Sequence, residues 1–136
     1  MFSFEILPHT SDFRLKITGN SQKELFTGAI SGMNSVLKTI DIYEKGEISL
    51  NIEIQSDDTS MLIIDFLSEV LSLSYIKKAI FNDIQFRELT EKKVIANIMG
   101  ISVDGFDEDI KGVSYSEIEI KRNEVGELEA IVVFDI

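Results

Sequence analysis

The stretch EISLNIEIQ at residues 47–55 carries the clearest folding signal in the chain, and SDDTSMLIIDFLSEVLSLSYIKK follows it at residues 56–78. Every second residue of the first stretch is apolar, which predicts a strand with one buried face. In the second stretch, apolar residues cover much of a helical circumference, so we expect a deeply buried helix. Asp57, Asp58 or Thr59 can cap the start of that helix.

The flanking segments predict further strands and one more helix. Alternating apolar residues indicate strands at residues 2–6 and 13–17. Ser21 and Glu24 form a capping box before a helix whose apolar face extends to Leu37. Beyond residue 80 the pattern predicts one strand after another, near residues 84–86, 94–98, 114–121 and 127–135. The predicted fold is therefore α+β, a single domain over residues 1–136 with two helices packed on a mostly antiparallel or mixed sheet.

Composition narrows the classes to which the protein can belong. The 136 residues fit one domain, and the absence of cysteine excludes disulfides, thiolate metal sites and cysteine nucleophiles. The N-terminal residues lack the basic-then-apolar pattern of a secretory signal. The apolar stretch at residues 61–73 contains Asp65 and Glu69 and is shorter than a bilayer span. We therefore expect a soluble cytoplasmic protein with no membrane partner.

The charge balance is strongly acidic. Lys and Arg number 13 against 24 Asp and Glu, which gives a net charge of −11. Such a chain repels a phosphate backbone, so direct binding to nucleic acid is not expected. A basic protein partner, or a metal ion held by carboxylates, suits that sign better. Acidity that serves only solubility is the alternative explanation.

Standard catalytic motifs are absent from the sequence. It has no phosphate-binding glycine loop and no nucleophile elbow, and His9 is the single histidine. Without thiols or further histidines, an ordinary zinc site is excluded. Oxygen ligation remains, which is the chemistry of hard divalent cations such as calcium or magnesium. The acidic segment at residues 104–109 lacks the ligand order of a calcium loop, and a solvated turn explains it better.

Two features near the ends of the chain suggest where a cation could bind. Asp12 closes a loop between two predicted strands, and Asp135 and Ile136 end the sequence directly after the last strand. We expect the terminal carboxylate of Ile136 to be held beside Asp135, where two neighbouring anions repel each other and a cation would relieve the repulsion. Spacing alone favours the simpler alternative that Asp12 is a turn residue and Asp135 a solvated strand end.

Several sequence blocks, in order along almost the whole chain, resemble the archease family. The hallmark His-Thr-Ala-Asp of that family is similar to His9-Thr10-Ser11-Asp12. The other matching blocks are Gly19-Asn20-Ser21 through Phe26, Ser56-Asp57-Asp58 with Phe66-Leu67-Ser68-Glu69, Ile110-Lys111-Gly112-Val113-Ser114-Tyr115, and the ending Val133-Phe134-Asp135-Ile136. Each block is weak alone, and together they make a specific match.

The resemblance implies an α+β fold and a divalent cation near the hallmark loop, with calcium favoured and magnesium or manganese as alternatives. Its implied ligands are the side chains of Asp12 and Asp135 with the carboxylate of Ile136. Lys111 matches a family lysine and would contact a partner or a phosphate. His9 matches the hallmark histidine and would likewise contact a partner or a phosphate, with a structural role in orienting the loop as an equal alternative.

The sequence also departs from the family pattern beside the hallmark loop. Phe13 and Arg14 replace the small or aliphatic residues usual after the aspartate. This departure bears on the shape of the site. Ser11, Gly112 and Ser114 are milder replacements.

The resemblance further implies an accessory protein rather than an enzyme. Archeases act with RtcB-type tRNA-splicing ligases, promoting guanylylation of the ligase and repeated turnover. A chaperone-like module acting on a tRNA methyltransferase is the alternative partner assignment, and it needs no metal. An independent metal-dependent hydrolase is disfavoured because only His9 could act as an additional general base.

Overall fold

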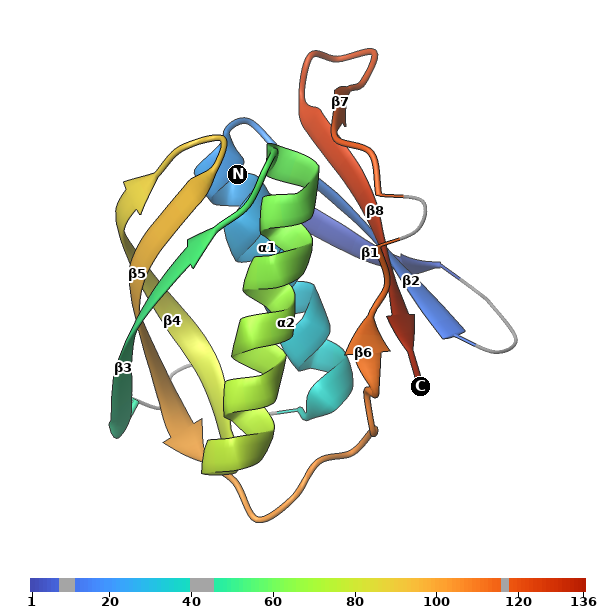
Figure 1. The fold of residues 1–136 in the computed structure, drawn as a ribbon. Helices are drawn as coiled ribbons and strands as arrows, with labels where there is room; N and C mark the ends of the chain where they lie inside the picture. Colours follow the sequence, from blue (N-terminus) through green and yellow to red (C-terminus); the bar gives the residue numbers. More distant parts are fainter. Residues whose placement is uncertain (8–11, 40–45, 116–117) are drawn as a thin grey trace.

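The computed structural model describes residues 1–7, 12–39, 46–115 and 118–136, which form two helices and two antiparallel sheets (Figure 1). The elements in chain order are β1 (Ser3–Leu7), β2 (Asp12–Gly19), α1 (Gln22–Leu37), β3 (Ile48–Gln55), α2 (Thr59–Lys77), β4 (Ala79–Leu89), β5 (Lys93–Ser102), β6 (Gly112–Val113), β7 (Lys121–Arg122) and β8 (Leu128–Asp135). The predicted α+β class is confirmed.

Each sheet combines segments that are distant in sequence. The first has the order β1-β2-β8-β6, with β7 also paired to β8. The second has the order β3-β5-β4. In the first sheet, β2 from the start of the chain therefore lies against β8 from its end, and this pairing positions the candidate site.

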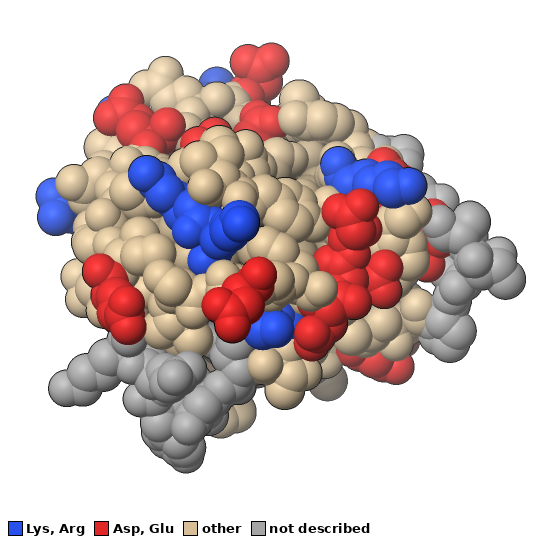
Figure 2. Space-filling view, turned by 90° about the horizontal axis from the view of Figure 1, so that it is seen from below, with Lys and Arg blue, Asp and Glu red and all other residues tan. Residues whose placement is uncertain are grey.

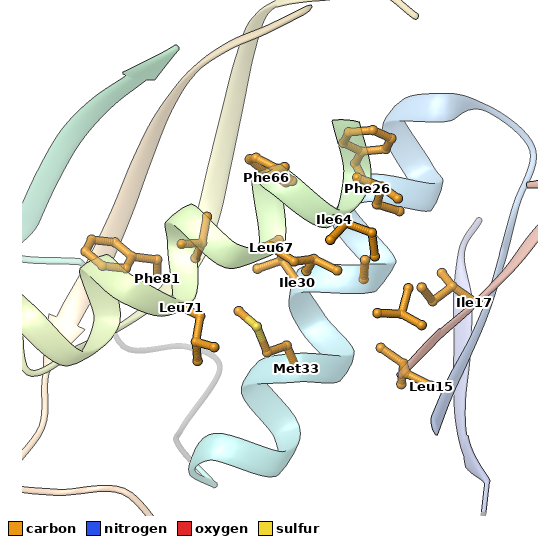
Figure 3. Close-up of a cluster of buried hydrophobic side chains, with 14 of the residues drawn as sticks. Leu15, Ile17, Phe26, Ile30, Met33, Ile64, Phe66, Leu67, Leu71 and Phe81 are labelled. Atoms are coloured by element: carbon orange, nitrogen blue, oxygen red, sulfur yellow. The ribbon is translucent and has the colours of Figure 1, made fainter. Parts of the chain in front are cut away.

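The two helices lie between the two sheets rather than on the outer face of one sheet (Figure 1). Helix α1 contacts β2 of the first sheet and β4 of the second, while α2 contacts β4 and β6. Figure 3 shows side chains of both helices and both sheets pointing into one apolar interior. Burial of these side chains supplies the main favourable term in folding.

Local sequence signals explain where the helices begin and end. The Ser21 hydroxyl oxygen accepts a hydrogen bond from the Glu24 amide at 3.2 Å, and the Asp58 carboxylate accepts one from the Met61 amide at 2.8 Å. Helix α2 stops at Lys78, whose φ of 50° is in the left-handed region. Because this residue reverses the chain, β4 starts at once at Ala79, earlier than the sequence pattern predicts.

The strand predicted at residues 114–121 is the main difference from expectation. Only two short strands, β6 and β7, pair with β8 in this region of the described chain. Val113 pairs with Phe134 and Lys121 with Glu129, so eight residue steps (121 − 113) face only five (134 − 129). The three extra residues cannot stay in register, and the pairing is interrupted.

Helix α2 has 19 residues and is long and apolar enough, by length and composition, to cross a membrane. The helix is longer than the apolar stretch at residues 61–73, which by itself is too short to span a bilayer. In the fold, α2 is a core helix, and its buried residues are Leu62, Ile63, Ile64, Phe66, Leu67, Val70, Leu71 and Ser74.

Candidate functional site

The pairing of β2 with β8 brings together the two acidic residues predicted from the ends of the sequence. Asp12, the first residue of β2, is the direct register partner of Asp135, the last residue of β8. Directly opposed residues of an antiparallel pair point to the same face, with Cβ atoms about 5 Å apart. The two carboxylates therefore share one corner of the first sheet, at the end of β8 marked C in Figure 1.

An aromatic pair next to these carboxylates fixes the register. Phe13 and Phe134, the neighbouring register partners, point to the opposite, buried face and stack with ring centroids 4.7 Å apart. A one-residue slip of either strand would turn the ring of that strand toward solvent and break the stack, so the burial of both rings keeps Asp12 opposite Asp135. Phe13, which departs from the family pattern, thus supports the geometry of the site.

The two carboxylates differ in exposure. Asp12 is half-buried, with its Oδ1 atom shielded from solvent, whereas Asp135 is exposed. Arg14 lies on the same face two residues from Asp12 and is opposite Val133. A basic side chain of the protein therefore borders the acidic corner.

Strand β6 lies on the other side of Asp135. Gly112 is the register partner of Asp135, and the Lys111 amide donates a hydrogen bond to the Asp135 carbonyl oxygen at 2.7 Å. A side-chain carbon at Gly112 would lie 4.0 Å from Asp135 Oδ2. The absence of that carbon leaves space beside the carboxylate.

Lys111 joins the cluster through its backbone. Neighbouring residues of an extended segment point to opposite faces, so Gly112 rather than Lys111 shares the face of Asp12 and Asp135. The Lys111 side chain is exposed, and it takes part in none of the ion pairs among the described residues. Its ammonium group is therefore available to a partner at the sheet edge.

The remaining predicted site residues are Ile136 and His9. Ile136 follows Asp135 directly and is 40% exposed, so its main chain lies next to the acidic corner. His9 belongs to residues 8–11, which lie outside the described residues. Its predicted role stays a prediction.

The donor atoms at this corner are oxygens. Within the described ranges no group of three Asp, Glu, His or Cys side chains is close enough to hold a metal ion. Asp12 and Asp135 would thus need further oxygens, from the Ile136 carboxylate, from carbonyl groups or from water. Such a set suits a hard cation with six to eight oxygen ligands better than zinc.

The other acidic candidates have structural partners. Asp58 caps α2. Within the segment at residues 104–109, Asp107 lies 3.7 Å from the Lys38 ammonium group and accepts from the Thr39 amide, and Asp109 faces the Tyr75 hydroxyl at 3.4 Å. These contacts favour the structural explanation that the sequence pattern also favoured.

A hydrogen-bond network next to the corner was not anticipated from the sequence. Asp65 of α2 accepts hydrogen bonds from the Ser56 hydroxyl and from the Tyr115 hydroxyl, both at 2.5 Å. The bond to Asp65 raises the pKa of Tyr115 above its usual value. Tyr115 belongs to a block that resembles the archease family, whereas Asp65 has no local pattern to mark it.

A pocket lies elsewhere in the molecule, away from the acidic corner. It has a volume of about 350 Å³, and residues of β1, α1 and β4 line it, among them Phe4, Ile30, Asn34 and Ile84. None of the predicted site residues lines this pocket. The acidic corner is an open site at a sheet end, suited to an ion or a protein surface rather than to an enclosed substrate.

Charges of both signs are interspersed on the molecular surface. Figure 2 shows a face on which basic side chains form small groups between acidic ones. This face offers no continuous positive surface of the kind that binds a nucleic-acid backbone.

Comparisons with known proteins agree with this architecture. The model of the Archease protein family matches residues 4–136. An archease of Methanosarcina barkeri is 30% identical over 98% of this chain and 95% of its own, and that of Pyrococcus abyssi is 28% identical over the full length of both.

Two solved structures share the fold. The solution structure of Methanobacterium thermoautotrophicum protein 1598 has a TM-score of 0.79 at 23% identity, covering 98% of both chains. The crystal structure of a Thermotoga maritima archease, described as a possible chaperone, has a TM-score of 0.66 at 23% identity and covers 97% of this chain and 96% of its own. The family match over almost the full length, together with the M. barkeri relative, leads to one conclusion: the chain belongs to the archease family.

Proposed function

We propose that this protein is a non-catalytic activator of an RtcB-type tRNA-splicing RNA ligase, and that a divalent cation at the acidic corner organises the surface that it presents. Membership of the archease family supports an accessory role. The observation that carries the proposal is the register pairing of Asp12 with Asp135 at the end of β8. The buried Phe13–Phe134 pair holds the two carboxylates opposite each other, and a cation bound between them would reduce their mutual repulsion.

The geometry favours a hard cation at this corner. Asp12, Asp135 and the terminal carboxylate of Ile136 would supply charged oxygens, and the missing side chain at Gly112 leaves space beside Asp135. Calcium is the favoured ion because it accepts irregular oxygen sets completed by water, while magnesium and manganese are alternatives. The cation would supply positive charge and would hold the chain end in a fixed place.

The rest of the chain suits contact with a protein. The net charge of −11 complements a basic ligase surface, and the exposed Lys111 at the sheet edge can contact an acidic or phosphate group there. In the proposed role the protein acts in the cytoplasm and does not bind RNA directly.

A guanylylation assay with an RtcB-type ligase tests this proposal. Asp12→Asn and Asp135→Asn should each reduce stimulation at least tenfold, and a chelator should reduce stimulation by the unaltered protein. Asp104→Asn is the matched control, because Asp104 is an exposed carboxylate outside the corner. Full stimulation by both corner variants would refute the proposed mechanism.

A second candidate function is a chaperone-like module for an RNA-modifying enzyme such as a tRNA methyltransferase. The description of the T. maritima protein as a possible chaperone favours it. This role needs no cation, so an effect on the methyltransferase that survives chelation would support it over ligase activation.

A further inference from the structure

The segment from Ile110 to Tyr115, here called the strap, is tied to α2 at both ends. At its start, the Tyr75 hydroxyl donates to the Ile110 carbonyl oxygen and accepts from the Ile110 amide, both at 2.8 Å. At its end, the Tyr115 hydroxyl donates to Asp65 Oδ1. Asp65 and Tyr75 are both residues of α2.

The spacing of these two ties matches an extended strap. Asp65 and Tyr75 are ten residues apart, which corresponds to about 15 Å along an α-helix. The five residue steps from Ile110 to Tyr115 span about 16 Å in extended chain. The strap therefore lies stretched along α2, in agreement with the place of β6 between α2 and β8 in Figure 1.

The other edge of the strap is bonded to the end of β8. The Lys111 amide donates to the Asp135 carbonyl oxygen at 2.7 Å, and the Ser114 amide donates to the Val133 carbonyl oxygen at 2.8 Å. Gly112 lies opposite Asp135. Helix α2 thus holds one edge of the strap, and the acidic corner is built along the other.

The tie at Asp65 depends on hydrogen bonding more than on burial. Tyr115 is 53% exposed, so packing alone does not fix its ring. The Asp65 carboxylate is half-buried, and it also accepts from Ser56, the residue before the capping turn of α2. Hydrogen bonds to a charged acceptor are stronger than those between neutral groups, so this contact adds a strong restraint at the end of the strap, beside the bond from the Ser114 amide to the Val133 carbonyl oxygen.

We propose that Asp65 and Tyr75 are positioning residues for the acidic corner. Through the strap, they fix Lys111 and the main chain of Asp135 relative to Asp12. The proposal relies on the proposed function for what the corner does, but the restraint itself is a property of the protein alone. Neither Asp65 nor Tyr75 would contact the proposed cation or the ligase directly.

Hydrogen exchange of the cation-free protein tests the restraint directly. Tyr115→Phe should speed exchange of the Lys111 and Ser114 amides roughly 10- to 100-fold, the effect of losing a hydrogen bond to a charged group. Asp65→Ala should do the same. Asp65→Asn, which keeps an acceptor for the tyrosine, should restore much of the protection.

Thr59→Val is the matched control for these variants. It removes a hydroxyl hydrogen bond from the same helix, from Thr59 to the Glu91 carbonyl oxygen at 3.1 Å, without touching the strap. Its strap amides should exchange as in the unaltered protein. Unchanged strap exchange in both Tyr115→Phe and Asp65→Ala would overturn the restraint.

Calorimetric titration with calcium, at a temperature where all variants are folded, tests the positioning role. Tyr115→Phe and Tyr75→Phe should bind calcium several-fold more weakly than Thr59→Val. Equal affinities despite faster strap exchange would overturn the positioning role. If the unaltered protein binds no calcium, the proposed function fails instead, and the exchange data still decide whether α2 restrains the strap.

Discussion

Tyr75 holds a hydroxyl group at the start of the strap in surroundings that oppose its ionisation. Burial is the largest cause that raises the pKa of this hydroxyl, and the nearby Asp109 and Glu108 carboxylates raise the pKa further. The hydrogen bond that the hydroxyl accepts from the Ile110 amide lowers the pKa, but by less. A phenolate at this position would also lose the hydrogen bond that it donates to the Ile110 carbonyl oxygen. Folding therefore favours the protonated form of Tyr75.

Stability should fall at alkaline pH for this reason. In the unfolded chain Tyr75 ionises at its ordinary value of 10, so above that pH the folded state holds more protons than the unfolded state. The stabilising contribution is complete below pH 10 and is lost as pH rises through the raised folded pKa. Denaturant unfolding of the unaltered protein and of Tyr75→Phe, measured across this window, should show a shallower decline in the variant. An equal decline in both would contradict the assignment to Tyr75.

Single residues of the site differ in how far the sequence predicts them. Asp12 and Asp135 stand out because each ends a strand at one end of the chain, and their opposition follows from the register. Lys111 was predicted for its side chain, yet its amide is the group that contacts Asp135. Asp65 could not be predicted, because a carboxylate on an apolar helix gives no local sign of a partner fifty residues away.

Helix α1 depends on glycine where it crosses β2. A Cβ atom at Gly32 would lie 2.5 Å from a methyl carbon of Leu15, which is fully buried, so the Leu15 side chain would have to shift within the core. Helix propensity alone favours alanine over glycine by about 1 kcal/mol, but overpacking a core costs roughly 1–3 kcal/mol.

Gly32→Ala should therefore destabilise the protein, by up to about 2 kcal/mol, despite its better helix propensity. Thermal or denaturant unfolding measures the change. The double variant Gly32→Ala with Leu15→Val should be less destabilised than the sum of the two single variants, because the shorter side chain makes room. A stabilising effect of the single variant would show that α1 and β2 are less tightly packed than described.

At the level of elements, periodicity predicts the long segments and fails for the short ones. The alternation at residues 47–55 becomes β3, and the apolar run after Asp58 becomes the core helix α2. Strands β6 and β7 have two residues each, too few to show any period. Their positions depend on the register of β8, a long-range property that no local pattern contains.

For the whole molecule, the decisive feature is that two sheets enclose both helices while the ends of the chain meet in one sheet. The helices join the sheets through one apolar core. The pairing of β2 with β8 then closes the chain on itself and places two carboxylates at one corner. The sequence predicts the class of fold but not the division of its strands between two sheets, because that division depends on which distant strands pair.

The central claim is that one corner of the first sheet, formed by Asp12, Asp135 and the carboxylate of Ile136, binds a single hard cation. Calorimetric titration of the purified protein with calcium tests it most directly, with Asp12→Asn and a chain extended by one glycine after Ile136 as comparisons. We predict one calcium ion per chain for the unaltered protein and at least tenfold weaker binding for both altered forms. Undiminished binding by both altered forms, or no binding by the unaltered protein, would contradict the claim.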